Sequence, residues 1–351
     1  MRVLGIETSC DETAASVVEN GTKVLSNVIA SQIDLHKKTG GVVPEVAARE
    51  HILKIIPVIK ETLEQGGCEW KDIDGIAAVP GPGLISALLT GTLTASTLAL
   101  VKEKPLIPVH HILGHIYGNW CGREKEKFEF PILILTVSGG HNDLILMKNH
   151  GEFELIGQSR DDAAGEAFDK VAKLLGLGYP GGPAIQKAAL EGNKNAFDFP
   201  KAKLGSNSNG NSEIFDYSFS GLKTAVLYAV QEKYGKDYLP EKLNRKFVCD
   251  TAASFQKTVV DTLIDRLENA ADKYNPKEIH IAGGVSANLA LREEAKTRLV
   301  KFNVPIKYPV DISYCTDNAA MIASCGYFLF NKDPNKYKNW QNIQPSADFT
   351  F

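Results

Sequence analysis

The spacing of apolar and polar positions along the chain predicts three strands followed by alternating helices and strands. Short apolar stretches of strand length open the sequence, and Asn20-Gly21, a strong hairpin signal, separates the second from the third. Residues 45–65 carry apolar side chains at helical spacing and end at Gly66-Gly67. The expected elements are strands at residues 3–8, 14–19 and 24–30, helix 45–65, strand 73–79, helix 84–101, strand 106–109 and a helix beginning near residue 110.

The second half of the chain repeats this order. Its expected elements are strands 131–137, 144–147 and 153–157, helix 162–175, a long and mainly helical stretch to about residue 274, strand 278–282, helix 287–300, strand 304–308 and helix 317–330. A polar loop at residues 205–211 interrupts the helical stretch. Two copies of one α/β unit predict the actin-like ATPase fold, in which two ribonuclease-H-like domains flank a central, ligand-binding cleft.

The repeat also predicts where the domains begin and end. Residues 1–110 form the expected N-terminal ribonuclease-H-like domain, which the C-terminal segment 320–351 completes. Residues 111–319 form the expected second domain, with a mainly helical insertion at about residues 183–275. The length of 351 residues agrees with two domains, since a domain commonly holds about 100–200 residues.

Composition narrows the class of protein. With 44% hydrophobic and 23% charged residues, the chain has the balance of a folded globular protein. It has no uninterrupted run of about 18 apolar residues, and the acidic Glu7 comes too early for a signal peptide. We therefore expect a cytoplasmic protein with no membrane span. Six cysteines without a Cys-x-x-Cys pair argue against a disulfide scaffold, and the net charge of −3 argues against strong nonspecific binding to nucleic acid.

Three turns rich in small residues follow predicted strands. They are Thr8-Ser9-Cys10-Asp11, Ser138-Gly139-Gly140 and Gly283-Gly284-Val285-Ser286. Glycine lets backbone N–H groups approach a phosphate without interference from a Cβ atom, and hydroxyl groups add donors. One Gly-Gly pair is more often a simple tight turn than a phosphate site. Three such turns at equivalent places in a repeated unit favour a site for a nucleotide-like phosphate.

A histidine pair is the second chemical signal. His111 and His115 lie four residues apart, so a helix starting near residue 110 puts both imidazoles on one face, where they can share a metal ion. The pair alone is equally compatible with two structural histidines. Asp317, which opens a predicted helix after a strand of the second unit, is the candidate third ligand. Two imidazoles and one carboxylate suit iron(II) or zinc acting as a Lewis acid.

The same pair invites comparison with zinc metalloproteases. Their common motif is His-Glu-x-x-His, in which the glutamate is the general base. Ile112 takes that position here and cannot transfer a proton, so the sequence argues against peptide hydrolysis at this site.

A third block, residues 161–170, is rich in acids. On a helix, Asp162, Glu166, Asp169 and Lys170 recur at spacings of four and three. Most runs of this kind are solvated helix faces with ion pairs. The small residues between the acids favour close backbone packing, and an aspartate at the cleft end of the helix is well placed to bind ribose hydroxyls.

Eight blocks of sequence are more specific together than any single motif. They are GIETSCDET at residues 5–13, PEVAAREH at 44–51, VHHILGH at 109–115, VSGGH at 137–141, DDAAGEAFDK at 161–170, SFSGLKTA at 218–225, AGGVSAN at 282–288 and CTDNAAM at 315–321. In this order, over essentially the whole chain, they resemble the tRNA N6-adenosine threonylcarbamoyltransferases, formerly called O-sialoglycoprotein endopeptidases. Block 161–170 resembles the bacterial branch of that family.

The resemblance implies an actin-like fold and one divalent metal ion per subunit, Fe2+ in preference to Zn2+. It implies transfer of a threonylcarbamoyl group from threonylcarbamoyl-AMP, which a separate enzyme makes, to N6 of adenosine 37 in tRNAs that read codons beginning with A. The product is t6A. By motif position, His111, His115 and Asp317 would hold the metal. Thr136, Val137, Ser138, Gly139, Gly140, Asp169, Gly182 and Asn288 would hold the adenylate.

Such a transfer needs no enzyme nucleophile, because the adenylate is a mixed anhydride with AMP as its leaving group. It needs a polarised carbonyl, a neutralised phosphate and a positioned amine that loses a proton. Asp11 and Glu12, at the end of the first strand, are the candidates for the catalytic base. Small departures from the family pattern occur at Ser86, Asn142 and Gln186, and the last leaves one ribose contact open.

The resemblance also implies partners besides tRNA, namely an inactive paralogous subunit and a small ATPase subunit. Two other interpretations remain open on the sequence: an ATP-dependent phosphotransferase of the same fold, such as a sugar or acetate kinase, and a nucleotide-gated scaffold without chemistry. A tRNA enzyme with this net charge needs a local basic surface or one supplied by partners, so we expect the isolated chain to bind tRNA weakly.

Overall fold

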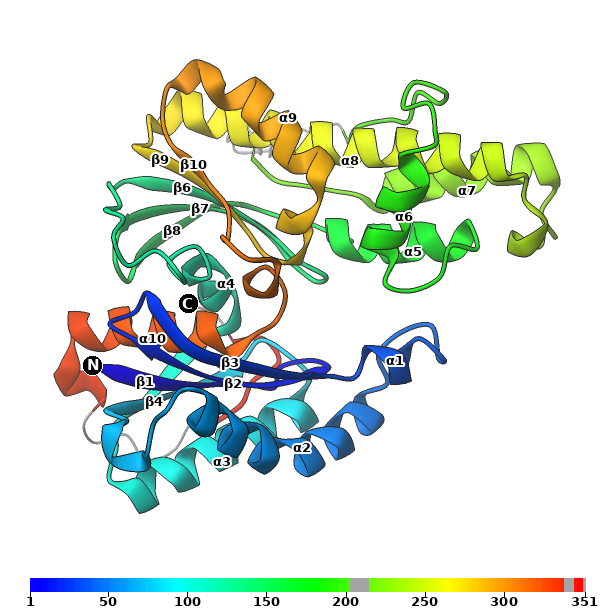
Figure 1. Cartoon of the computed structure of the whole chain (residues 1–351). Helices are drawn as coiled ribbons and strands as arrows, with labels where there is room; N and C mark the ends of the chain where they lie inside the picture. Colours follow the sequence, from blue (N-terminus) through cyan, green and yellow to red (C-terminus); the bar gives the residue numbers. More distant parts are fainter. Residues whose placement is uncertain (203–214, 338–343, 350–351) are drawn as a thin grey trace. The chain divides into compact units, whose positions relative to one another are not determined.

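A computed structural model describes residues 1–202, 215–337 and 344–349 of the chain. It divides into two compact units, each described here by itself (Figure 1). Unit 1 comprises Met1–Phe128, His150–Glu152 and Tyr308–Phe351, and unit 2 comprises Glu129–Asn149 and Phe153–Lys307. The predicted loop at 205–211 lies outside the described residues.

Unit 1 is built on a five-stranded sheet in the order β3-β2-β1-β4-β5. Its strands are β1 (Arg2–Glu7), β2 (Glu12–Glu19), β3 (Lys23–Ser31), β4 (Gly75–Gly81) and β5 (Leu106–His110). The first three form an antiparallel meander, and β4 and β5 add on in parallel with β1 through helical crossovers. This is the arrangement that the hairpin signal and the helical spacing predict.

Helices cover both faces of the sheet of unit 1 (Figure 1). They are α1 (Ile33–His36), α2 (Pro44–Gln65), α3 (Ile85–Lys102), α4 (His111–Tyr117) and α10 (Ala319–Lys332), with short 3-10 turns at Trp70–Asp72, Ile312–Tyr314 and Pro334–Tyr337. On one face, Leu4 and Ile6 of β1 join a core with α2 and α3. On the other face, α10 packs so closely that a Cβ atom on Gly5 would lie 2.4 Å from the backbone oxygen of Ala319.

Unit 2 repeats the plan with a sheet in the order β10-β9-β6-β7-β8. Its strands are β6 (Ile132–Val137), β7 (Asn142–Asn149), β8 (Glu152–Gln158), β9 (Glu278–Ala282) and β10 (Ile306–Lys307). Its helices are α5 (Ala164–Leu174), α6 (Gly181–Ala189), α7 (Ser220–Tyr234), α8 (Arg245–Tyr274) and α9 (Leu289–Leu299), with 3-10 turns at Pro240–Lys242, Gly284–Ala287 and Val300–Phe302. The predicted α/β class and order of elements are therefore confirmed in both units.

The division into units differs from the predicted domains at two boundaries. Residues 111–128 and 308–319 lie in unit 1, whereas the prediction assigned them to the second domain. The reason is that β5 runs directly into α4, and α4 packs against α10 beside the first sheet. The histidine pair and Asp317 consequently belong to the same unit.

Two helices begin later than predicted because asparagines cap them. The side chain of Asn288 accepts a hydrogen bond from the backbone N–H of Leu291, and that of Asn318 accepts one from Met321. Each cap satisfies an N–H group that the first helical turn leaves without a partner. Asp317 therefore lies just before α10, in a loop, and not within the helix.

The helix α3 meets, by length and composition alone, the criterion for a membrane span among the described residues, although only 33% of it is buried in the fold. Core helices of soluble proteins meet the same criterion. Here α3 packs on β4 and α2, so one of its faces is committed to the core of unit 1.

Candidate metal centre and phosphate-binding loops

The histidine pair lies on α4, at the carboxyl end of β5. His110 ends the strand and caps the helix, since its Nδ1 accepts the N–H of Ile112 at 3.2 Å. His111 and His115 follow one turn apart, both buried. Their rings meet edge to face with centroids 4.7 Å apart, so the two imidazoles face one region, as the i and i+4 spacing predicts.

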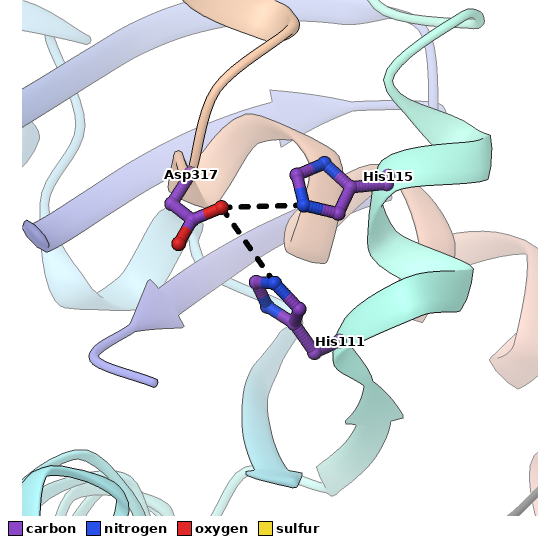
Figure 2. Close-up of side chains that lie close together, drawn as sticks. All are labelled: His111, His115 and Asp317. Atoms are coloured by element: carbon purple, nitrogen blue, oxygen red, sulfur yellow. Dashed lines mark ion pairs between the residues drawn. The ribbon is translucent and has the colours of Figure 1, made fainter. Parts of the chain in front are cut away.

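Asp317 completes a set of three ligand atoms within 4.8 Å of one another (Figure 2). Its Oδ1 lies 3.2 Å from Nε2 of His115 and 3.6 Å from Nε2 of His111. Ligand atoms about 2.1 Å from one metal ion stand about 3.0–3.4 Å apart at octahedral or tetrahedral angles, close to these distances. The structure thus places Asp317 beside the histidine pair.

The hydrogen bonding of His115 tests whether these residues fit a metal ion. The ring is buried, Nδ1 has no hydrogen-bond partner, and Nε2 makes no hydrogen bond although Oδ1 of Asp317 lies 3.2 Å away. Buried polar atoms without a partner are uncommon in folded proteins. A divalent ion bound by Nε2 would give that nitrogen a partner, so the set fits one metal ion.

His111 differs from His115 because two side chains contact its other nitrogen. Nδ1 lies 3.0 Å from Oε2 of Glu7 and 3.1 Å from Oγ of Ser9. Burial lowers the pKa of His111, but the carboxylates of Asp317 and Glu7 outweigh burial and raise it to about 9. The two carboxylates therefore favour the protonated ring when no metal ion is bound, and binding of a metal ion to this ring is linked to proton release.

Of the two candidate bases, Asp11 lies in the turn between β1 and β2, and Glu12 is the first residue of β2. Asp11 is buried, and Oε1 of Glu12 accepts a hydrogen bond from Ser31 at 3.0 Å. Burial together with the charges of Asp317 and Asp11 raises the pKa of Glu12 to about 9. Burial and the charge of Asp11 also raise the pKa of Cys10, which keeps its thiol protonated and unreactive. The charge of Asp317, the third candidate metal ligand, therefore acts on the carboxyl group of Glu12.

The two glycine turns of unit 2 meet at the carboxyl ends of neighbouring strands. Thr136 of β6 pairs with Ala282 of β9, so the turns that follow these strands are adjacent. Gly283 adopts φ +85°, and a Cβ atom there would lie 2.4 Å from the backbone oxygen of Val137. A Cβ atom on Gly165 of α5 would lie 2.5 Å from the backbone oxygen of Ser138. Only glycine permits these approaches.

Beside these packed glycines, other glycines border open space. A Cβ atom on Gly139, Gly140, Gly182 or Gly284 would meet no atom within 4 Å. The hydroxyl groups of Thr136 and Ser286 are buried at the same strand ends and have no hydrogen-bond partner. A phosphate site needs hydrogen-bond donors that have no other partner, next to backbone that the phosphate can approach closely. This arrangement provides both.

Asp169, Gly182 and Asn288 lie at the starts of two further helices. Oδ1 of Asp169 accepts the N–H of Gly181 at 2.6 Å, which holds the start of α6 against α5. Asn288 caps α9 and donates through Nδ2 to Gln256 at 2.9 Å. Gln186 accepts the N–H of Leu289 at 2.7 Å and so connects α6 to α9. The position that departs from the family pattern therefore has a helix-capping contact.

The family model for tRNA N6-adenosine threonylcarbamoyltransferase matches residues 23–324. The chain belongs to this family. Curated members from Dehalococcoides mccartyi and Thermomicrobium roseum are each 50% identical over 94% of this chain and cover 94% and 92% of their own lengths. A member from Bacillus cereus is 49% identical over 94% of this chain and 92% of its own length.

Solved structures support the fold of this family member at much lower identity. HypF from T. kodakarensis matches with a TM-score of 0.61 and 14% identity over 96% of this chain and 49% of its own. Component A of (R)-2-hydroxyglutaryl-CoA dehydratase from Acidaminococcus fermentans matches with a TM-score of 0.50 and 16% identity over 93% of this chain and 98% of its own. At such identities the likeness shows the fold alone, which is that of the actin-like ATPases.

The acidic block of the family member has a mainly structural use. Asp161 accepts hydrogen bonds from Phe219 and Ser220 and caps α7, while Asp162 pairs with Lys170 at 2.9 Å and Lys223 at 2.7 Å. These two aspartates precede α5 and connect it to α7. The expected i,i+4 ion pair on a helix face occurs between Glu166 and Lys170, at 2.7 Å, whereas Asp162 forms its ion pairs from the loop before α5.

Sequence reasoning missed Glu7, Ser9 and Gln256 as parts of these sites. The sequence analysis used Glu7 as evidence against a signal peptide and as part of a family block, but gave it no role at the site, although an acidic residue that ends an apolar strand is an available signal. The sequence placed Ser9 in a candidate phosphate-binding turn, but its hydroxyl contacts His111, a candidate metal ligand. Gln256 lies in the middle of α8, where no local pattern marks it.

Proposed function

We propose that this chain is a metal-dependent acyltransferase that acts in the cytoplasm. It transfers the threonylcarbamoyl group from threonylcarbamoyl-AMP to N6 of adenosine 37 in tRNAs that read codons beginning with A, and so forms t6A. The observation that carries the proposal is the His111, His115 and Asp317 set, in a chain whose relatives at about half identity bear the name of this transferase. We expect one divalent ion per subunit, Fe2+ in preference to Zn2+.

The proposed adenylate site uses the loops of unit 2. Backbone N–H groups of residues 136–140 receive the phosphate, and the hydroxyl of Thr136 adds a donor that has no other partner. Gly182 provides close approach at the start of α6. Asn288 caps α9 through Oδ1 and has a second side-chain N–H besides the one that it donates to Gln256. Asp169 is the proposed contact for the ribose, in addition to holding α6.

The chemistry follows from the mixed anhydride of the substrate. A divalent ion, when bound, supplies Lewis-acid polarisation of a carbonyl or phosphoryl oxygen. Asp11 and Glu12 are the proposed bases for the proton that the adenine amine must lose. Ser9 is not a nucleophile of the triad type, because it and Glu7 contact the same nitrogen of His111, which cannot relay a proton from one to the other.

The proposed partners are tRNA, an inactive paralogous subunit and a small ATPase subunit. Apolar side chains that are more than half exposed occur on two adjacent helices of unit 1, at Ile52 and Leu53 on α2 and at Leu93 and Leu100 on α3. Apolar patches of this kind mark interaction surfaces. We assign this surface to the paralogous subunit, because a homologue with the same helices can bury a matching apolar face.

The test is a single-turnover assay with preformed threonylcarbamoyl-AMP, unmodified tRNA, and the chain with its partners. We expect t6A from the wild-type chain and a loss of about 100-fold or more for Asp317→Asn, since the ligand set then lacks its carboxylate. Asp272→Asn, an exposed position on α8, is the matched control and should retain wild-type transfer. Near-normal transfer by both Asp11→Asn and Glu12→Gln would exclude both as the base.

The same assay separates the alternatives. A phosphotransferase would phosphorylate a sugar or acetate with magnesium-ATP and would not depend on His111 and His115. A metalloprotease is disfavoured because Ile112 is buried beside the pair and offers no proton-transfer group. Absence of t6A together with phosphoryl transfer would replace the proposal with the phosphotransferase.

A further inference from the structure

Glu7 is a fully buried carboxylate at the last position of β1, beside the candidate metal ligand His111. Each of its oxygens has its own partner. Oε2 lies 3.0 Å from Nδ1 of His111, and Oε1 accepts the backbone N–H of Ser9 at 2.5 Å. The β1–β2 pairing, in which Glu7 faces Ala14, holds the backbone of this residue in place.

The contacts of His111 use the two ends of its ring for different purposes. Nδ1 faces Glu7, with the Ser9 hydroxyl 3.1 Å from the same nitrogen, and Nε2 faces Asp317. The hydroxyl can accept as well as donate, so it is compatible with a proton on Nδ1. A carboxylate accepts hydrogen bonds and cannot donate them, so Glu7 favours the tautomer with the proton on Nδ1 and leaves the lone pair of Nε2 available. Histidines that bind metals commonly have such a partner on the second nitrogen, which orients the ring and raises its basicity.

We propose that Glu7 is a positioning residue that orients His111 as a metal ligand and joins it to the turn that carries the candidate bases. The inference rests on the metal site of the proposed function. Its second part follows from the Ser9 contact, because one carboxylate holds both the imidazole and the first residues of the turn leading to Asp11. His115 has no corresponding partner, so this orienting contact acts on one histidine of the pair.

The variant Glu7→Gln tests the proposal sharply. A glutamine side chain has one acceptor oxygen, whereas Glu7 accepts from both the Ser9 N–H and the His111 ring. If the glutamine oxygen keeps the Ser9 N–H, the NH2 group faces Nδ1 of His111 and can only donate to it, which moves the ring proton to Nε2. If the oxygen faces His111 instead, the hydrogen bond from the Ser9 N–H is lost. We expect the dissociation constant for zinc, measured by competition with a chromophoric chelator, to rise by about 10- to 100-fold.

Glu19→Gln is the matched control. Glu19 lies on the paired strand β2 and contacts Arg2 at 2.9 Å, away from the histidines. It should leave the zinc constant within about twofold of the wild type. An unchanged zinc constant in Glu7→Gln, with the wild type binding one zinc, would overturn the inference and leave the metal site intact. No zinc binding by the wild type would instead overturn the metal site itself.

A second measurement needs no variant at Glu7 and so avoids any folding defect. Nitrogen NMR of the zinc-loaded wild-type chain, labelled at histidine, reports which nitrogen of each ring carries a proton. We expect His111 to carry it on Nδ1, with slow exchange because Glu7 accepts it in a buried place. A proton on Nε2, or a metal bound through Nδ1, would contradict the proposal.

Discussion

At the scale of single residues, glycines separate into two groups that the sequence does not distinguish. Gly165 and Gly283 are required by close backbone contacts, since an added Cβ atom would lie 2.5 Å or less from a carbonyl oxygen. Gly139 and Gly140 have no such neighbour and border open space. Gly165 and Gly283 therefore allow the loops to pack, whereas Gly139 and Gly140 leave space that a ligand can occupy.

This difference predicts opposite results for one chemical change. Gly165→Ala should lower the free energy of unfolding by about 1–3 kcal/mol, because backbone must shift around the new methyl group. Gly140→Ala should leave stability within about 0.5 kcal/mol and should instead weaken binding of the adenylate. Thermal unfolding and a binding titration with a non-hydrolysable adenylate analogue measure the two effects. Equal stability of the two variants would contradict the packing argument.

At the scale of elements, the positions of the candidate metal ligands His111 and His115 depend on how the start of α4 is held. His110 caps this helix, and its Nε2 lies 2.6 Å from the backbone oxygen of Phe349 near the C-terminus. Ser346 donates its N–H to the backbone oxygen of Pro80 at 2.8 Å. The C-terminal tail, residues 344–349, therefore fastens the ends of β4 and β5, from which α4 begins.

Removal of the tail should weaken the metal site without touching a ligand. A chain ending at residue 343 loses both hydrogen bonds and the packing of Phe349 on His110, and we expect it to lose about 1–3 kcal/mol of stability. Its zinc affinity should fall as well, since α4 is then less well ordered. A chain that lacks only residues 350 and 351 is the control. If the shortened chain binds zinc as tightly as the full chain, the tail does not support the metal site.

At the scale of the whole molecule, the distribution of charge determines the nonspecific affinity of the chain for nucleic acid. The formal net charge is −3, and many surface lysines are paired, such as Lys170 with Asp162 and Glu166. Nonspecific attraction to phosphates needs unpaired basic groups and releases counterions when they bind.

The isolated chain should therefore bind tRNA weakly. We expect affinity to increase when the partner subunits are added, and to fall with salt in the complex. Filter binding of unmodified tRNA at several salt concentrations measures both effects. Tight binding by the chain alone that does not change with salt would be inconsistent with this charge balance.

The sequence by itself determined the order of elements, because periodicity and turn residues are local properties. It predicted the meander of β1–β3 from one Asn-Gly turn, the helical spacing of α2, and the His111 and His115 pair from a four-residue interval. The repeated order of elements pointed to Asp317 as the third ligand, the family resemblance implied the same residue, and the structure places it 3.2 Å from His115.

Only the tertiary structure decided which residues support the site. The contact of Glu7 with His111 spans 104 positions in the chain, and that of His110 with Phe349 spans 239. The tertiary structure also places α4 and Asp317 in unit 1, and it pairs Asp162 with Lys223. Such contacts arise from packing between distant elements, and no local pattern of hydrophobic and polar positions carries them.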